Sequence, residues 1–76
     1  MRYRRAVRVL ISEPAEADAL IQFLWERRFL GVREAASSIE VAAPVGLLPY
    51  ATRYRLRRSL REWNVGHPGA EASLLD

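Results

Sequence analysis

Residues 5–24 have the sequence RAVRVLISEPAEADALIQFL, and two hydrophobic periods meet within this stretch. In residues 5–12 the apolar side chains alternate, and this period of two with β-branched members predicts a β-strand. Beyond Pro14 the apolar side chains recur at helical spacing, which predicts a helix over residues 14–29 with one buried stripe. Proline suits the first turn of a helix, where its missing N–H is not needed. A strand therefore leads directly into a helix.

Local signals mark both ends of this predicted helix. Ser12 or Glu13 can cap its N-terminus with a side-chain oxygen. Acidic residues lie at its beginning and arginines at its end, as the helix dipole favours. Gly31 is the predicted C-terminal stop, since glycine adopts the left-handed conformation that ends many helices.

The rest of the chain continues the alternation of strands and helices. Residues 32–43 are expected to be extended, either as a hairpin that turns at two central serines or as one long, bent strand. An apolar loop bounded by prolines follows at residues 44–49 and leads into a second helix over residues 49–63. Residues 70–75 are the predicted last strand, which either pairs within the chain or is exchanged with another subunit.

The predicted element order is β-α-β-β-α-β. Because each helix connects two strands, right-handed crossovers place both helices on one face of the sheet. The order therefore predicts an α+β two-layer sandwich of the ferredoxin-like kind, formed by residues 1–76 as a single small domain. The predicted core draws on every element and consists of Val7, Val9, Ile11, Leu20, Ile21, Leu24, Val32, Ile39, Val41, Leu56, Leu60, Trp63 and Leu74.

Composition argues against several classes of function. The 76 residues include no cysteine, which excludes disulfides, thiolate catalysis and cysteine-based zinc sites. His67 is the only histidine, and it lies in a turn without the clustered groups that zinc or a catalytic base requires. No Walker loop is present and no pair of acids suggests acid–base catalysis. We therefore expect no catalytic residues, no metal site and no cofactor, and a protein that is not an enzyme.

The sequence also lacks the signals of membrane insertion and export. No run approaches the roughly 18 apolar residues of a spanning helix. The N-terminal segment is basic, but its apolar run is short and interrupted by Arg8, unlike a signal peptide. We therefore expect a cytoplasmic protein without a membrane partner.

The second predicted helix carries the first candidate surface. All 12 basic residues of the chain are arginines, and the formal net charge is +3. On the helix side opposite the core, a helical projection gathers Tyr50, Tyr54, Arg57, Arg58 and Arg61. Arginines can bind phosphates while a tyrosine stacks on a base, so this ridge is a candidate nucleic-acid-binding site. An ordinary solvated helix face is the alternative explanation.

Surplus apolar residues form the second candidate surface. They come from the first helix and from the proline-bounded loop, and they are Phe23, Trp25, Val45, Leu47 and Leu48. Exposed aromatic and aliphatic residues are typical of interface centres, which predicts contact with a second copy or another protein. Internal packing under the sheet or the C-terminal segment is the alternative.

These features favour a non-catalytic protein-interaction module, either a homodimer or an accessory subunit. A nucleic-acid-binding module that uses the arginine and tyrosine ridge is the second hypothesis. The predicted open face of the sheet offers no aromatic side chain, which disfavours the RNA-binding mode known for this topology. A small-ligand regulatory domain is the third hypothesis, although Glu13 at the first strand–helix junction would repel an anionic ligand.

Overall fold

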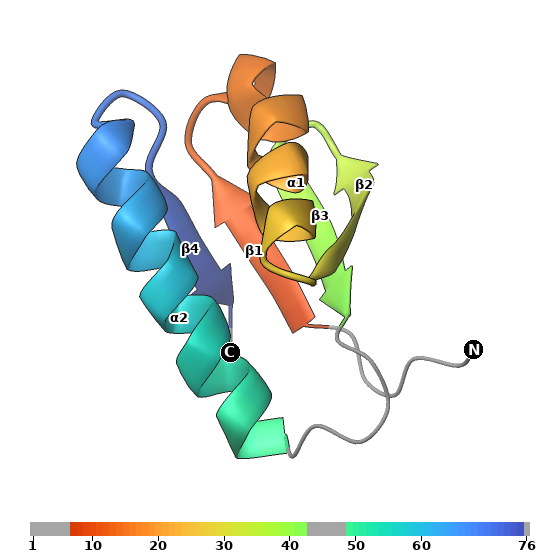
Figure 1. Cartoon of the computed structure of the whole chain (residues 1–76). Helices are drawn as coiled ribbons and strands as arrows, with labels where there is room; N and C mark the ends of the chain where they lie inside the picture. The colour runs from red at the N-terminus through yellow and green to blue at the C-terminus, as the bar shows by residue number, and fades with distance from the viewer. Residues whose placement is uncertain (1–6, 43–48, 76) are drawn as a thin grey trace.

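The computed structural model describes residues 7–42 and 49–75, in which strands and helices alternate along the chain (Figure 1). The elements are β1 (Val7–Ile11), a 3₁₀ turn (Pro14–Glu16), α1 (Ala17–Glu26), β2 (Leu30–Ala35), β3 (Ser38–Ala42), α2 (Pro49–Gly66) and β4 (Ala72–Leu75). Residues 30–42 thus form the hairpin, with a turn between β2 and β3, and not the single bent strand.

The four strands form one sheet in the order β2-β3-β1-β4, with every neighbouring pair antiparallel. Both helices pack on the same side of this sheet (Figure 1). The predicted α+β arrangement of a sheet covered by two helices is therefore confirmed. The last strand pairs with β1 of its own chain, with Ile11 opposite Ala72 and Arg8 opposite Leu75.

The core lies between the sheet and the two helices, and most of its predicted members are buried there. The buried apolar residues are Val9, Ile11, Ala17, Leu20, Leu24, Phe29, Ile39, Val41, Leu56, Leu60, Trp63, Ala70 and Ala72. Val7, Ile21 and Leu74 are partly buried against this cluster.

The prediction that Val32 is buried was wrong. Its neighbour Gly31 faces the helices, because a Cβ built there would lie 3.2 Å from Ile39 Cγ2 and 3.6 Å from Ile21 Cγ1. Successive side chains of a strand point to opposite faces, so Val32 lies on the far side of the sheet with 56% of its surface exposed. Phe29, which was not predicted, is buried next to β2 instead.

Helix α1 is shorter than predicted, and Gly31 does not end it. Arg28 adopts the left-handed conformation with φ 69°, and its N–H donates to the carbonyl of Trp25 at 2.9 Å. The N–H of Phe29 reaches back to the carbonyl of Leu24 at 2.9 Å, which completes a Schellman motif. This reversal turns the chain into β2 and places Phe29 in the core. A non-glycine residue in this conformation costs roughly 1–2 kcal/mol.

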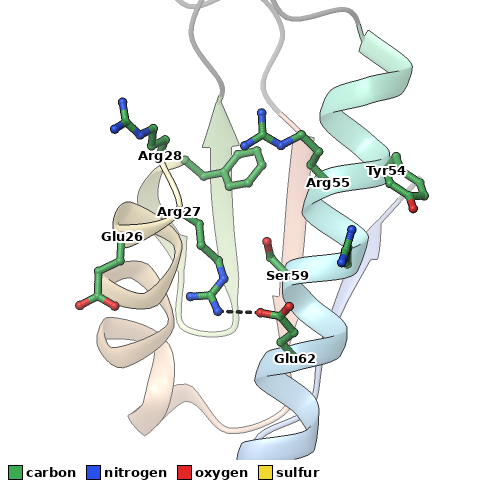
Figure 2. A pocket seen from close by; sticks show the side chains of 9 residues that line it. Glu26, Arg27, Arg28, Tyr54, Arg55, Ser59 and Glu62 are labelled. Atoms are coloured by element: carbon green, nitrogen blue, oxygen red, sulfur yellow. Dashed lines mark hydrogen bonds and ion pairs between the residues drawn. The ribbon is translucent and has the colours of Figure 1, made fainter.

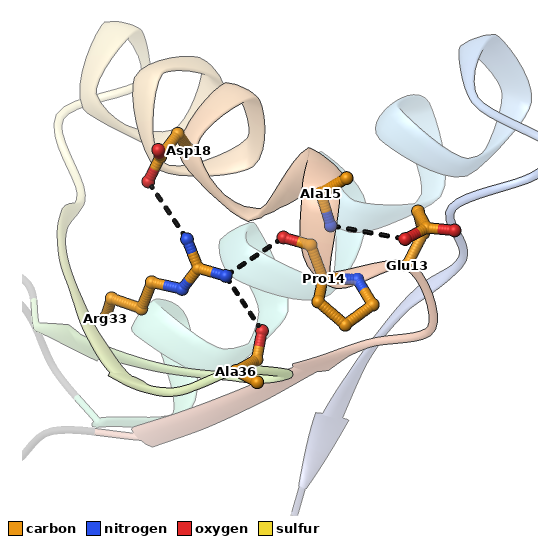
Figure 3. A network of polar contacts seen from close by, with 6 residues as sticks. All are labelled: Glu13, Pro14, Ala15, Asp18, Arg33 and Ala36. Atoms are coloured by element: carbon orange, nitrogen blue, oxygen red, sulfur yellow. Dashed lines mark hydrogen bonds and ion pairs between the residues drawn. The ribbon is translucent and has the colours of Figure 1, made fainter.

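The beginning of α1 is joined to the β2–β3 turn by Arg33 (Figure 3). Its guanidinium donates to the carbonyls of Pro14 at 3.0 Å and Ala36 at 3.2 Å, and it lies 3.5 Å from Asp18 Oδ1. Of the two predicted caps, the side chain of Glu13 accepts from the N–H of Ala15 at 3.2 Å. The negative charge at this junction is therefore already engaged in structural contacts.

An aromatic column joins the two helices to the turn before β4. Trp63 contacts Phe23 edge-on at a centroid distance of 5.4 Å and stacks on His67 at 3.5 Å. The guanidinium of Arg27 covers the Phe23 ring, with 3.8 Å between Cζ and the ring centroid. The indole N–H of Trp63 donates to the carbonyl of Ala70 at 2.8 Å. His67 therefore has a packing role in the described structure.

Asn64 attaches β4 to the end of α2. Its side-chain NH₂ donates to the carbonyl of Ala72 at 2.9 Å, and its Oδ1 accepts from the N–H of Ala72 at 2.7 Å. On the side of β4 that faces β1, the backbone N–H of Ser12 donates to the carbonyl of Glu71 at 2.9 Å. The first residue of the edge strand therefore has its outward backbone groups satisfied by a side chain.

Candidate functional site

The exposed side of α2 is strongly basic, as the sequence indicated. The helix carries five arginines and one glutamate, which leaves a net charge of +4. Four of the predicted ridge residues have exposed side chains, namely Tyr54, Arg57, Arg58 and Arg61. The side chain of the fifth, Tyr50, lies outside the described part of the chain.

The ridge borders two separate hollows. Tyr54 and Arg58 line a pocket between α2 and the end of α1. Arg57 and Arg61 line a groove on the other side of α2, next to β4. The predicted residues therefore share one helix side but divide between two binding environments, which a projection of the isolated helix cannot reveal.

The first hollow, called the interhelical pocket below, has a volume of about 400 Å³ (Figure 2). Its lining consists of Glu26, Arg27, Arg28, Phe29, Tyr54, Arg55, Arg58, Ser59 and Glu62. Four arginines against two glutamates give this lining a net charge of +2. The end of α1 supplies one wall and α2 supplies the other, so the two walls come from distant parts of the sequence.

One arginine of the interhelical pocket is engaged in an ion pair, and three are not. A guanidinium nitrogen of Arg27 lies 2.6 Å from Glu62 Oε1, as the dashed line in Figure 2 shows. Arg28, Arg55 and Arg58 form no ion pair with any residue that the structure describes. The pocket therefore keeps three cationic groups available for an anion.

Ser59 supplies a hydroxyl group to the same pocket. The residue is only 8% exposed. The hydroxyl points from α2 into the space between the two helices (Figure 2). The lining therefore offers a neutral hydrogen-bond donor beside its arginines.

The second hollow is the groove between α2 and the edge strand β4, with a volume of about 500 Å³. Arg57, Arg61 and the exposed Val65 lie along it. An added strand would need the outward backbone groups of β4, but Asn64 already binds both of those groups at Ala72. The groove is therefore poorly suited to strand addition along its whole length.

The predicted apolar interface residues have different environments. Phe23, expected as surplus apolar surface, is only half-buried but packs against Trp63 as part of the core. Trp25 is 59% exposed on α1. Val45, Leu47 and Leu48 lie outside the described residues. Of these predicted interface residues, Trp25 is therefore the one whose described side chain is mostly exposed.

The face of the sheet away from the helices carries exposed apolar residues that were not among the predicted interface residues. Leu10, Val32 and Leu75 lie on it and are all exposed. The strand register places Val32 opposite Glu40, Glu40 opposite Arg8, and Arg8 opposite Leu75. One row therefore crosses all four strands, with apolar residues at its ends and opposite charges in the middle. The alternating side chains of residues 5–12 are the sequence signal for this exposed row.

Arg8 of this row also belongs to a polar cluster with Glu34 and Ser38. Arg8 Nε lies 2.7 Å from Glu34 Oε1, and Ser38 Oγ donates to the same carboxylate at 2.9 Å. The hydrogen bond from Ser38, followed by that from Arg8, lowers the pKa of Glu34 from its ordinary value. Any stabilisation from this carboxylate is therefore present above its ordinary pKa and disappears as the pH falls through the lowered value.

Two classes of site have no counterpart in the described residues. No group of three or more histidine and carboxylate side chains is placed to hold a metal ion in residues 7–42 and 49–75. None of the helices in those ranges has the length and apolar character needed to cross a bilayer. Comparisons of the chain with protein families, curated proteins and solved structures found no match. The chain's own geometry therefore carries the functional argument.

Proposed function

We propose that the protein is a self-associating interaction module whose dimer interface is the open face of the sheet. The observation that carries this proposal is the exposure of Leu10, Val32 and Leu75 on one face that neither helix covers. These are three of the six large hydrophobic side chains that are exposed in the described part of the chain. Exposed apolar side chains on one uncovered face favour a protein contact over solvent.

The charges on this face favour a second copy as the partner. A two-fold axis through the middle of the row can place Glu40 of one copy against Arg8 of the other, so the surface is self-complementary. The helical side has the opposite property, because two α2 helices with a net charge of +4 each would repel one another. Self-association is therefore assigned to the sheet and not to α2.

We also propose that the two-layer sandwich is of the ferredoxin-like type. The support is the element order together with the sheet order β2-β3-β1-β4. In this sheet β3 separates the two strands that α1 connects, and β1 separates the two that α2 connects. Such split crossovers leave one sheet face without helices, which is the face assigned to the dimer.

Val32→Lys is expected to dissociate the dimer. The lysine would lie opposite Glu40 within the monomer, so the fold should tolerate it, whereas the interface would have to bury an additional charge. We expect the dimer dissociation constant to rise at least about tenfold, measured by sedimentation equilibrium.

The matched control is Trp25→Lys, since Trp25 has a similar exposure of 59% but lies on α1. This variant should associate like the unmodified protein. A monomeric unmodified protein at about 100 µM would refute self-association. Dissociation by Trp25→Lys with an intact Val32→Lys dimer would move the interface to α1.

Nucleic-acid binding by α2 is a second candidate function, favoured by its five arginines. Each phosphate contact would release a counterion, so affinity for a labelled single-stranded oligonucleotide should fall steeply with salt. Replacing Arg57 and Arg61 together by alanine should weaken binding about tenfold or more and reduce the slope of log K against log salt by about 1.5. Fluorescence anisotropy provides both values. Unchanged affinity in this double variant would exclude the ridge as the site.

A further inference from the structure

We propose that the interhelical pocket binds the phosphate group of a small phosphorylated ligand. This site is independent of the proposed dimer, because it lies between the helices and the open sheet face lies on the other side of the sheet (Figures 1 and 2). It shares Tyr54 and Arg58 with the α2 ridge, but the other two described ridge residues, Arg57 and Arg61, line the groove beside β4 instead.

The first argument is the gathering of cationic groups from two distant segments. Arg28 lies at the rim on the α1 side, and Arg55 extends from α2 toward α1 in Figure 2. The dipole of α1 accounts for basic residues at its own C-terminus, but it does not account for Arg55 and Arg58 on α2. Guanidinium groups bind phosphate oxygens in a bidentate manner, so these arginines suit such a ligand.

The second argument is the hydroxyl of Ser59. It belongs to a residue that is more than nine-tenths buried, and it points into the pocket that the arginines line. A phosphate oxygen in the pocket would accept its hydrogen. This neutral donor is independent of the general positive charge of α2, so it marks a particular place within the pocket.

The third argument is the backbone of Arg28. Its φ of 69° is a conformation in which glycine would be more stable, yet the position holds an arginine at the pocket rim. Arg55 and Arg58 lie one helical turn apart, where like charges repel. The repulsion between Arg55 and Arg58 is reduced when an anion lies between them. Backbone strain of this kind is concentrated at functional sites.

The charge and size of the pocket indicate the class of ligand. A phosphomonoester carries about −1.5 to −2 charges at pH 7 and three acceptor oxygens, which matches several unpaired guanidiniums better than one carboxylate does. The volume of about 400 Å³ lies within the range of small-molecule sites and exceeds the needs of a phosphate group alone. A phosphate that carries an organic group therefore fits the pocket.

The test is calorimetric titration of the purified full chain with inorganic phosphate, adenosine monophosphate and adenosine at constant ionic strength. We expect saturable binding of both phosphate-bearing probes and none of adenosine. Tighter binding of the nucleotide would identify a phosphate with an attached organic group, whereas equal affinities would identify the phosphate alone. Both results support the site. The absence of saturable binding by either phosphate probe would overturn it.

Two charge-matched double variants locate the site. Replacing Arg55 and Arg58 by alanine should weaken phosphate binding about tenfold or more, because both line the pocket. Replacing Arg57 and Arg61 removes the same charge from the same helix and should change the affinity by less than about twofold. Equal losses in the two variants would show a general attraction to α2 and overturn the pocket.

Arg28→Gly separates binding from folding. Glycine is favoured at φ 69°, so this variant should melt at a higher temperature than the unmodified protein in the absence of phosphate. It should also bind phosphate several-fold more weakly, because it removes a lining cation. A more stable variant with weaker binding cannot be explained by unfolding. Unchanged affinity in both Arg28→Gly and Ser59→Ala would contradict the proposed contacts.

Discussion

Trp63→Ala is expected to lower the free energy of unfolding by about 3–5 kcal/mol. A chain of 76 residues has a total stability on the order of 4–11 kcal/mol, so this loss removes a large part of it. The indole is 2% exposed, contacts Phe23 and His67 with its ring and donates to the carbonyl of Ala70. The substitution would therefore leave a cavity at the point where both helices and the turn before β4 meet.

Urea denaturation followed by circular dichroism gives this difference directly. Trp25→Ala is the matched control, because it removes the same side chain from a position that is 59% exposed. Its free energy of unfolding should change by about 0.5 kcal/mol or less. Equal destabilisation by the two substitutions would show that the aromatic column does not have the structural importance inferred for it.

Asn64→Ala is expected to loosen β4 and to destabilise the fold by about 1–3 kcal/mol, since it leaves the N–H and C=O of the buried Ala72 without their side-chain partner. Hydrogen exchange should show faster exchange of the Ala72 amide and its β4 neighbours. The amides of β3 should change less, because β3 pairs on both sides with other strands.

Val65→Ala is the control for this experiment, because Val65 is the next residue of α2 and is 81% exposed. It should leave the exchange of β4 unchanged. Asn64→Asp keeps an acceptor for the Ala72 N–H but loses the donor, so an intermediate effect is expected. Undiminished protection of Ala72 in Asn64→Ala would show that pairing with β1 alone holds the strand.

The sequence allowed the element order and most of the core to be predicted, because hydrophobic period is a local signal. The errors occurred where the chain reverses direction. Arg28 ends α1 in a conformation usually signalled by glycine, so the predicted helix runs too far and its predicted stop at Gly31 is wrong. The glycine instead faces Ile21 and Ile39, which moves Val32 to the opposite face. One incorrect boundary therefore changed the expected environment of several residues.

The candidate sites were predictable only as far as each depended on one element. The exposed face of α2 followed from helical geometry, and four of its five residues have exposed side chains. Its division between two hollows depends on α1 and β4, which pack on either side of it. Likewise, Phe23 packs against Trp63, which is distant in sequence, so helical spacing alone could not decide between an interface and internal packing. The binding roles of both candidate surfaces remain predictions.

The position of β1 inside the sheet has a consequence for how the chain folds during synthesis. Its partners are β3 on one side and β4 on the other, and β4 ends at residue 75. Translation proceeds from the N-terminus. One edge of β1 therefore stays unpaired until β4, at the end of the described chain, has emerged from the ribosome. Contacts of such long sequence separation form slowly. A nascent chain interrupted before β4 would present an open strand next to an incomplete core, a state prone to pairing with other chains.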